Sequence, residues 1–145
     1  MALTDRSRRA TSASDPGRVA RLVAGDIVAF NLVTAIGLSN HGELTSLGAI
    51  PLVVTIAAPF AIGWFAVAPF LGLFKGEVAG QPRRMLARTA LAWLIALPIG
   101  LLLWSIVRQR PVQPAFAIVT FITNLIVLLG WRGVFAWLAA RGRGR

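Results

Sequence analysis

The sequence predicts an all-α integral membrane protein, a single four-helix bundle with both termini in the cytoplasm. The first observation is composition: 57% of the 145 residues are hydrophobic, 14% are charged, and the mean hydropathy is +0.73. A soluble domain usually has about 25% charged residues. The second is that the apolar residues form four long runs without a sustained polar face, each able to cross a bilayer. The third is that basic residues flank these runs mainly on one side.

The charge balance indicates which partners to expect. The net charge is +10, from 15 Lys and Arg against 5 Asp and Glu. Because the basic residues border apolar spans, we expect the lipid bilayer and its anionic head groups as partners, and no nucleic acid. The chain has no Cys, no Tyr and one His. These counts exclude thiolate chemistry and leave few groups for catalysis or metal binding, so we predict no enzymatic activity, no cofactor and no metal.

The first half of the chain is predicted to hold a tail and two spans. Residues 1–17 are rich in Ser, Thr, Ala and Arg, which is typical of a disordered cytoplasmic tail. A single transmembrane domain is expected over residues 18–140, and its first span, residues 20–38, is expected to remain uncleaved. The second apolar run, residues 47–74, would form a helix of about 42 Å, which is longer than a bilayer core of about 30 Å. We therefore expect the span to start late, at Pro51, and place it at residues 51–74. Pro59 and Pro69 are predicted to kink this span, because proline lacks a backbone N–H.

The second half is predicted to hold two further spans. The third span, residues 89–107, has small residues at intervals of four, Ala92, Ala96 and Gly100, which allow a neighbouring helix to approach closely. Pro98 is predicted to kink it. The fourth span is placed at residues 114–138, and residues 141–145 form a basic tail.

The orientation follows from the basic residues. All Lys and Arg residues except Arg108 and Arg110 fall on the side of the two termini. The positive-inside rule therefore predicts that both termini are cytoplasmic. We expect the protein to be a multi-pass component of the cell membrane.

Asp26 is an acid inside the first apolar run, where an ionisable group needs a partner. It lies five residues past Arg21, about 7–8 Å inward along a helix. Arg132 lies at a similar depth on the fourth span, and Arg88 lies somewhat shallower on the third. We therefore predict an Asp26–Arg132 ion pair near the cytoplasmic face, with Arg88 as the second choice. A structural clamp between two spans is the favoured role, and a transport or proton-handling role is the alternative.

Four polar residues are predicted near the middle of the bilayer: Asn31, Thr34, Thr120 and Asn124. Asn31 lies about 15 Å along the helix from Arg21, and Asn124 about 15 Å from Pro114. A hydrogen bond between amides of two helices is the favoured interpretation, worth about 1 kcal/mol. A polar cavity is the alternative.

His41 and Glu43 are predicted to lie on the outer loop between the first two spans. One histidine with one carboxylate is too few for a metal site. An external pH sensor is one interpretation, because free histidine titrates near neutral pH. An ordinary interfacial histidine is the favoured one.

Short motifs follow one another over nearly all of residues 18–137. They are Ala24-Gly25-Asp26, Ile36-Gly37 with Asn40-His41-Gly42, Pro59-Phe60 with Gly63-Trp64, Arg88-Thr89 with Ala92-Trp93 and Pro98, Pro114 with Phe116 and Val119-Thr120, and Gly130-Trp131-Arg132. In this order they resemble the small bacterial and archaeal membrane proteins of domain of unknown function 3054. The resemblance implies a four-span membrane fold and no established activity. In that family a basic residue often precedes the Pro-Phe pair, whereas Thr55 and Ile56 stand there in this chain.

Three classes of function follow from these features. The first is a non-enzymatic accessory subunit, scaffold or small oligomer that acts through helix contacts, which the small-residue stripe favours. The second is a small transporter or channel subunit, whose path Asp26, Asn31, Thr34, Thr55 and Asn124 would line. The third is an intramembrane enzyme, which is disfavoured because neither a nucleophile–base pair nor a metal-binding set is visible.

Overall fold

The computed structural model describes residues 15–43 and 47–142, which are helical apart from short connections and contain no strand. The elements are α2 (Pro16–Asn40), the 3-10 helix η1 (Leu47–Ala49), α3 (Ile50–Val67), α4 (Gly76–Ala79), α5 (Pro82–Arg108) and α6 (Pro114–Gly142). Four of them, α2, α3, α5 and α6, are long and apolar enough to cross a membrane. The predicted all-α, four-span fold is therefore confirmed.

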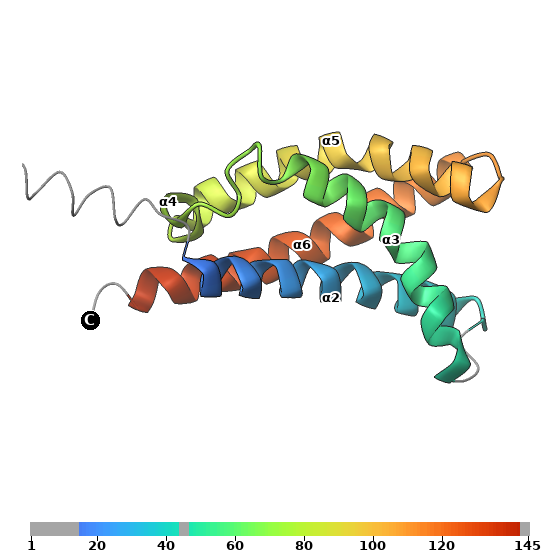
Figure 1. Cartoon of the computed structure of the whole chain (residues 1–145), viewed down its shortest axis with the longest axis horizontal. Helices are drawn as coiled ribbons and strands as arrows, with labels where there is room; N and C mark the ends of the chain where they lie inside the picture. Colours follow the sequence, from blue (N-terminus) through green and yellow to red (C-terminus); the bar gives the residue numbers. More distant parts are fainter. Residues whose placement is uncertain (1–14, 44–46, 143–145) are drawn as a thin grey trace, which may run out of the picture.

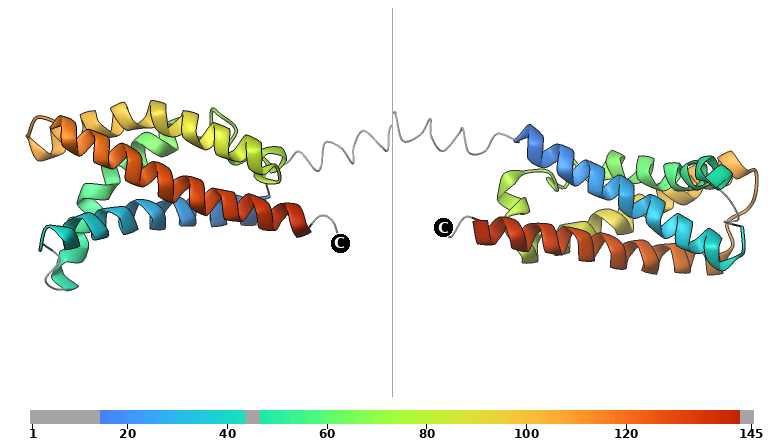
Figure 2. Two further views of the ribbon diagram at one scale, coloured as in Figure 1. Left: turned by 180° about the vertical axis from the view of Figure 1, so that it is seen from behind. Right: turned by 90° about the horizontal axis from the view of Figure 1, so that it is seen from below.

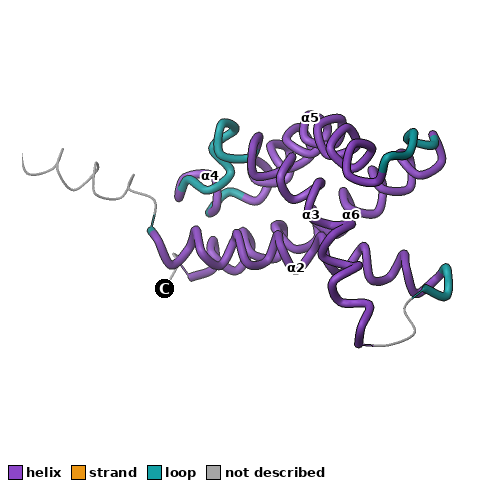
Figure 3. The backbone as a smooth tube through the Cα atoms, turned by 45° about the vertical axis from the view of Figure 1, so that its right-hand side comes forward, coloured by secondary structure: helices purple, strands orange, loops and turns teal. Residues whose placement is uncertain are grey.

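The bundle has one end that holds α4 and both ends of the described chain, Asp15 and Gly142 (Figure 1). We call it the terminal end. Helix α2 runs along one side of the bundle and α5 along the other. Helix α6 runs diagonally, from beside the end of α5 to beside the start of α2, and α3 crosses obliquely between α2 and α5 (Figures 1 and 2). Helix α3 packs mainly against α5, and α2 contacts both α3 and α6. Loops are confined to the two ends (Figure 3).

Local chemistry accounts for the helix ends. The Asp15 side chain accepts a hydrogen bond from the Gly17 backbone N–H at 3.1 Å, and Pro16 occupies the first turn of α2. Helix α5 also begins at a proline, Pro82, and ends at Arg108, where the next residue, Gln109, caps it in the left-handed conformation with φ 50°. The termini of these helices are thus set by caps and prolines as well as by hydropathy.

Several predicted boundaries differ from the observed ones. Helix α2 begins at Pro16, inside the predicted tail, and α5 begins at Pro82, seven residues before the predicted span. Hydropathy marks the apolar window of a helix, whereas the helix itself continues through exposed basic residues such as Arg83 and Arg84. Residues 1–14 and 143–145, the remainder of the two predicted tails, lie outside the described residues.

The predicted kink at Pro69 is wrong, because α3 ends at Val67 and Pro69 lies in the turn that follows. Proline offers no N–H to continue the helix. The chain instead makes successive tight turns, with the Phe70 N–H bonded to the Val67 carbonyl and the Gly72 N–H to the Pro69 carbonyl. Pro59 and Pro98 do lie inside helices, Pro59 buried in α3 and Pro98 exposed on α5.

Close packing between α3 and α5 depends on two glycines. A Cβ on Gly63 would lie 2.8 Å from the Ala96 carbonyl oxygen and 3.0 Å from the Gly100 nitrogen. A Cβ on Gly100 would lie 2.8 Å from Cδ1 of Phe60. The predicted small-residue stripe of α5 is buried and faces α3, where it lets the two backbones approach.

Aromatic side chains fill the centre of the bundle. The Phe30 ring lies 5.5 Å from Trp93 and 6.2 Å from Trp64, and Phe60 lies 6.5 Å from Trp93, all between ring centroids. The Trp93 indole N–H donates to the Phe121 carbonyl at 3.0 Å, which links α5 to α6. The middle of the bundle is therefore a packed apolar core.

Candidate functional site

Asp26 on α2 and Arg132 on α6 form a buried ion pair. Both side chains are 0% exposed. Arg132 donates through Nε to Oδ1 of Asp26 at 3.0 Å and through Nη2 to Oδ2 at 2.5 Å. This is the two-pronged geometry in which a planar guanidinium binds a carboxylate most strongly. The pair is the one that depth along the helices predicts.

A third helix completes the coordination of the carboxylate. The Trp64 indole N–H of α3 donates to Oδ2 of Asp26 at 2.9 Å. Asp26 therefore accepts three hydrogen bonds, from two helices, at a site without solvent exposure. A buried carboxylate is tolerated only when its oxygens are paired in this way.

The rest of the Arg132 guanidinium faces the terminal end of the bundle. Its Nη1 donates to the Leu73 carbonyl at 3.3 Å and lies 3.5 Å from the Met85 sulfur on α5. The guanidinium carbon also lies 5.1 Å from the ring centroids of both Trp64 and Phe74. One cation thereby contacts α2, α3, α5 and the turn after α3. Cation–π contacts are strongest when desolvated, as this one is.

Gly25 explains why α2 and α6 come close enough for the pair to form. The Trp131 indole occupies the space that a Cβ at Gly25 would fill, so the ring packs directly against the backbone of α2. Asp26 and Arg132 each follow the contacting residue by one position. Asp26 also lies ten residues after the start of α2 and Arg132 ten before the end of α6. The two helices are antiparallel, so both groups are about 15 Å from the terminal end.

Arg88, the second choice for Asp26, does not join the pair. Its Nη1 donates to the Leu71 carbonyl at 2.9 Å instead. Arg88 and Arg132 thus each bind one carbonyl of the turn between α3 and α4, where Leu73 is fully buried. Sequence reasoning placed this turn inside the second span and so missed the contributions of Leu73 and Phe74.

The predicted polar cluster near the midplane is not joined across helices. Asn31 donates to the Ile27 carbonyl at 2.8 Å and Thr34 to the Phe30 carbonyl at 2.9 Å. Asn124 donates to the Thr120 carbonyl at 3.0 Å. Each bond runs to the carbonyl four residues earlier on the same helix, which is always within reach of a short polar side chain. The favoured prediction of an interhelical amide hydrogen bond is therefore wrong.

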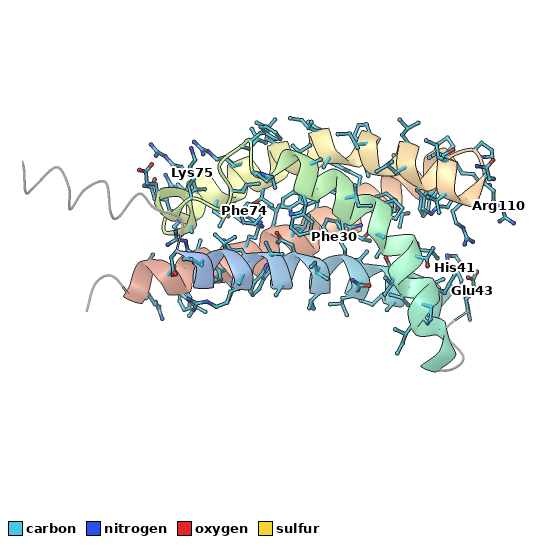
Figure 4. The ribbon with its side chains drawn as sticks, viewed as in Figure 1. Phe30, His41, Glu43, Phe74, Lys75 and Arg110 are labelled. Atoms are coloured by element: carbon cyan, nitrogen blue, oxygen red, sulfur yellow. The ribbon has the colours of Figure 1, made fainter. Side chains whose placement is uncertain are left out.

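His41 and Glu43 follow α2 and are exposed at the end of the bundle opposite Lys75 (Figure 4). The His41 backbone N–H closes the helix by donating to the Gly37 carbonyl at 3.2 Å. Within the described ranges, no group of three or more His, Cys, Asp or Glu side chains converges. The role of His41 as a pH sensor stays a prediction.

The comparisons with known proteins identify the family. The profile of the family described as "Protein of unknown function (DUF3054)" matches residues 23–135, which is most of the chain and includes both members of the ion pair. A search of curated proteins found no match, and neither did a search of solved structures. The chain belongs to the DUF3054 family, as its motifs predict.

Proposed function

We propose that this member of the DUF3054 family is a non-enzymatic component of the cell membrane that acts through contacts between helices, as an accessory subunit, a scaffold or a small oligomer. Two arguments support the proposal. One concerns the interior of the bundle and the other its outer surface.

The interior is arranged for rigidity. Its ion pair is bidentate, fully buried and attached to three helices and a turn. Removing either partner would leave an isolated buried charge, at a cost of about 3–5 kcal/mol. Beyond it lies the aromatic core of Phe30, Trp64 and Trp93. These features favour a fixed structural unit over an alternating transporter, in which the charged site would have to open to water.

The observation that carries the proposal is the placement of Asn31. Its side chain is half-buried on an outward face of α2, which it shares with Ile27 and Val28, 45% and 64% exposed. Among the described residues, its single hydrogen bond uses one of two N–H donors. At this depth lipid offers the remaining amide groups no partner, whereas a second transmembrane helix does.

The test compares two polar-to-apolar variants on lipid-facing positions. Asn31→Leu removes the amide, and Thr123→Val is the matched control because Thr123 also bonds only a carbonyl of its own helix, that of Val119 at 2.7 Å. Two differently tagged copies would be co-expressed, and pairing, together with any other co-purifying membrane protein, would be measured in lipid nanodiscs. We expect association in the wild type, about fivefold weaker association in Asn31→Leu for a loss of about 1 kcal/mol, and no change in Thr123→Val.

Two results would overturn the proposal. One is a wild-type chain that remains monomeric and brings no membrane protein with it from native membranes. The other is proton or solute flux through reconstituted wild-type protein that disappears in Asp26→Asn while the fold persists, which would favour the transporter instead.

A further inference from the structure

The turn between α3 and α4 has a surface that the ion pair does not explain. Phe70 is 90% exposed, more than any other large hydrophobic side chain in the described ranges, and Pro69 beside it is also exposed. The turn lies at the terminal end of the bundle, where the apolar spans give way to charged residues (Figure 1). An apolar ring with this exposure is stabilised by contact with lipid instead of water.

Two basic side chains lie beside this turn. Nη1 of Arg88 and Cδ of Lys75 are 2.9 Å and 3.3 Å from the position that a Cβ on Gly72 would occupy. Gly72 has a φ of +66°, which favours glycine, and its missing side chain leaves space beside the Arg88 guanidinium and the alkyl chain of Lys75. Figure 4 shows Lys75 on this loop, next to Phe74.

The positive charge here has no acidic partner in the described part of the chain. No ion pair within 4.0 Å joins Arg88 or Lys75 to a carboxylate of residues 15–43 or 47–142, although Glu77 is exposed two residues after Lys75. A third cation, Arg18 of α2, reaches the same loop, where its Nη2 lies 3.0 Å from the Cβ position of Gly76. Nε and Nη2 of Arg18 are buried and have no hydrogen-bond partner among residues 15–43 and 47–142. Like charges gathered in this way attract an anion.

We propose that the turn formed by residues 69–75 binds the phosphate group of an anionic glycerophospholipid. Lys75 and the donors of Arg88 that face away from the Leu71 carbonyl hold the phosphate, and Phe70 packs among the acyl chains. The neighbouring charge of Arg18 adds to the attraction. A free inorganic phosphate shares the charge but has no chains for Phe70 to contact, which is why a lipid is the favoured ligand. The proposal is independent of any association through Asn31.

The experiment is native mass spectrometry of the full chain released from mild detergent with phosphatidylglycerol and phosphatidylcholine in equal amounts. Lys75→Gln is the decisive variant, because the Lys75 side chain is exposed and makes no hydrogen bond with the described residues, so the substitution leaves the backbone bonds of the turn in place. Arg84→Gln is its matched control: it removes the same charge from an exposed position at the same end of the bundle. Phe70→Ser tests the acyl contact. A parallel sample contains millimolar inorganic phosphate.

The wild type should retain phosphatidylglycerol in preference to phosphatidylcholine. We expect Lys75→Gln to lower that preference about fivefold, because one basic residue near a surface adds about that factor to anionic-lipid binding. Phe70→Ser should lower retention of both lipids, and Arg84→Gln should change neither. Inorganic phosphate should not displace the lipid. Equal losses in Lys75→Gln and Arg84→Gln, or an absence of preference in the wild type, would overturn the proposal. Displacement by phosphate with no effect of Phe70→Ser would overturn the lipid as ligand.

Discussion

Removing the negative charge of the buried pair should destabilise the bundle more than any surface change. Asp26→Asn keeps the size of the side chain, but it leaves the Arg132 guanidinium charged, 0% exposed and facing an amide. Arginine stays protonated in proteins, so the site has no way to neutralise itself. Breaking such a pair costs about 3–5 kcal/mol, which is a large part of the usual stability of a domain. Unfolding by SDS in mixed micelles, followed by tryptophan fluorescence, measures the loss.

A double-mutant cycle tests whether the cost comes from the pair itself. Arg132→Gln alone should also cost several kcal/mol, because it strands the carboxylate. In Asp26→Asn with Arg132→Gln no buried charge remains, and two amides can still meet the Trp64 N–H and the Leu73 carbonyl. The double variant should therefore cost about 2–3 kcal/mol less than the sum of the single variants. Arg84→Gln, an exposed charge at the same end, should stay within about 0.5 kcal/mol of wild type. Additive losses, or an Asp26→Asn variant as stable as wild type, would refute the reasoning.

Four further outcomes follow from individual contacts, each checked by the same unfolding assay. The double variant Asp26→Arg with Arg132→Asp should not regain wild-type stability, because the Trp64 N–H would then face a cation. Wild-type stability in this variant would show that the residues around the pair do not depend on which position carries which charge. Trp64→Phe should cost about 1.5–3 kcal/mol by removing a hydrogen bond to a charged group. Gly63→Ala should cost about 1–3 kcal/mol, since its Cβ would meet the Ala96 backbone at 2.8 Å. Gly37→Ala, inside α2 with open space at its Cβ, should instead stabilise by about 0.5–1 kcal/mol, and equal effects of the two alanines would contradict the packing argument.

Depth in a bilayer explains how Asp26 could be matched to Arg132 from the sequence. In each span, the number of residues between a side chain and the membrane face gives the depth of that side chain. A buried charge can pair only with groups at a similar depth on other spans, so this count leaves few candidate partners. Counting alone left Arg88 as a second choice. The choice depends on Gly25 and Trp131, whose contact sets the rotation of α2 against α6. The contact forms because Gly25 has no side chain, and hydropathy gives no information about such close packing.

The turn after α3 could not be predicted by the same reasoning. Leu71, Leu73 and Phe74 are as apolar as the helix before them, so hydropathy extends the span through them. The structure folds them back over the ion pair, where the Leu73 carbonyl accepts from Arg132. The apolar residues therefore correctly predicted a segment shielded from water, but we expected lipid to surround it, whereas it packs against the protein interior. The asparagines failed for a different reason: a carbonyl one turn earlier on the same helix was nearer than any other helix.

The separation of Asp26 and Arg132 along the chain has a consequence for synthesis. The two residues are 106 positions apart, and Trp64 is 38 positions after Asp26. Because synthesis starts at the N-terminus, Asp26 of α2 is made before any of these bonding partners. The Trp64 indole of the next span is then the earliest of the bonding partners to arrive. The counter-charge lies on α6, the last of the four long helices, so the Asp26–Arg132 pair can form only after α6 has been made.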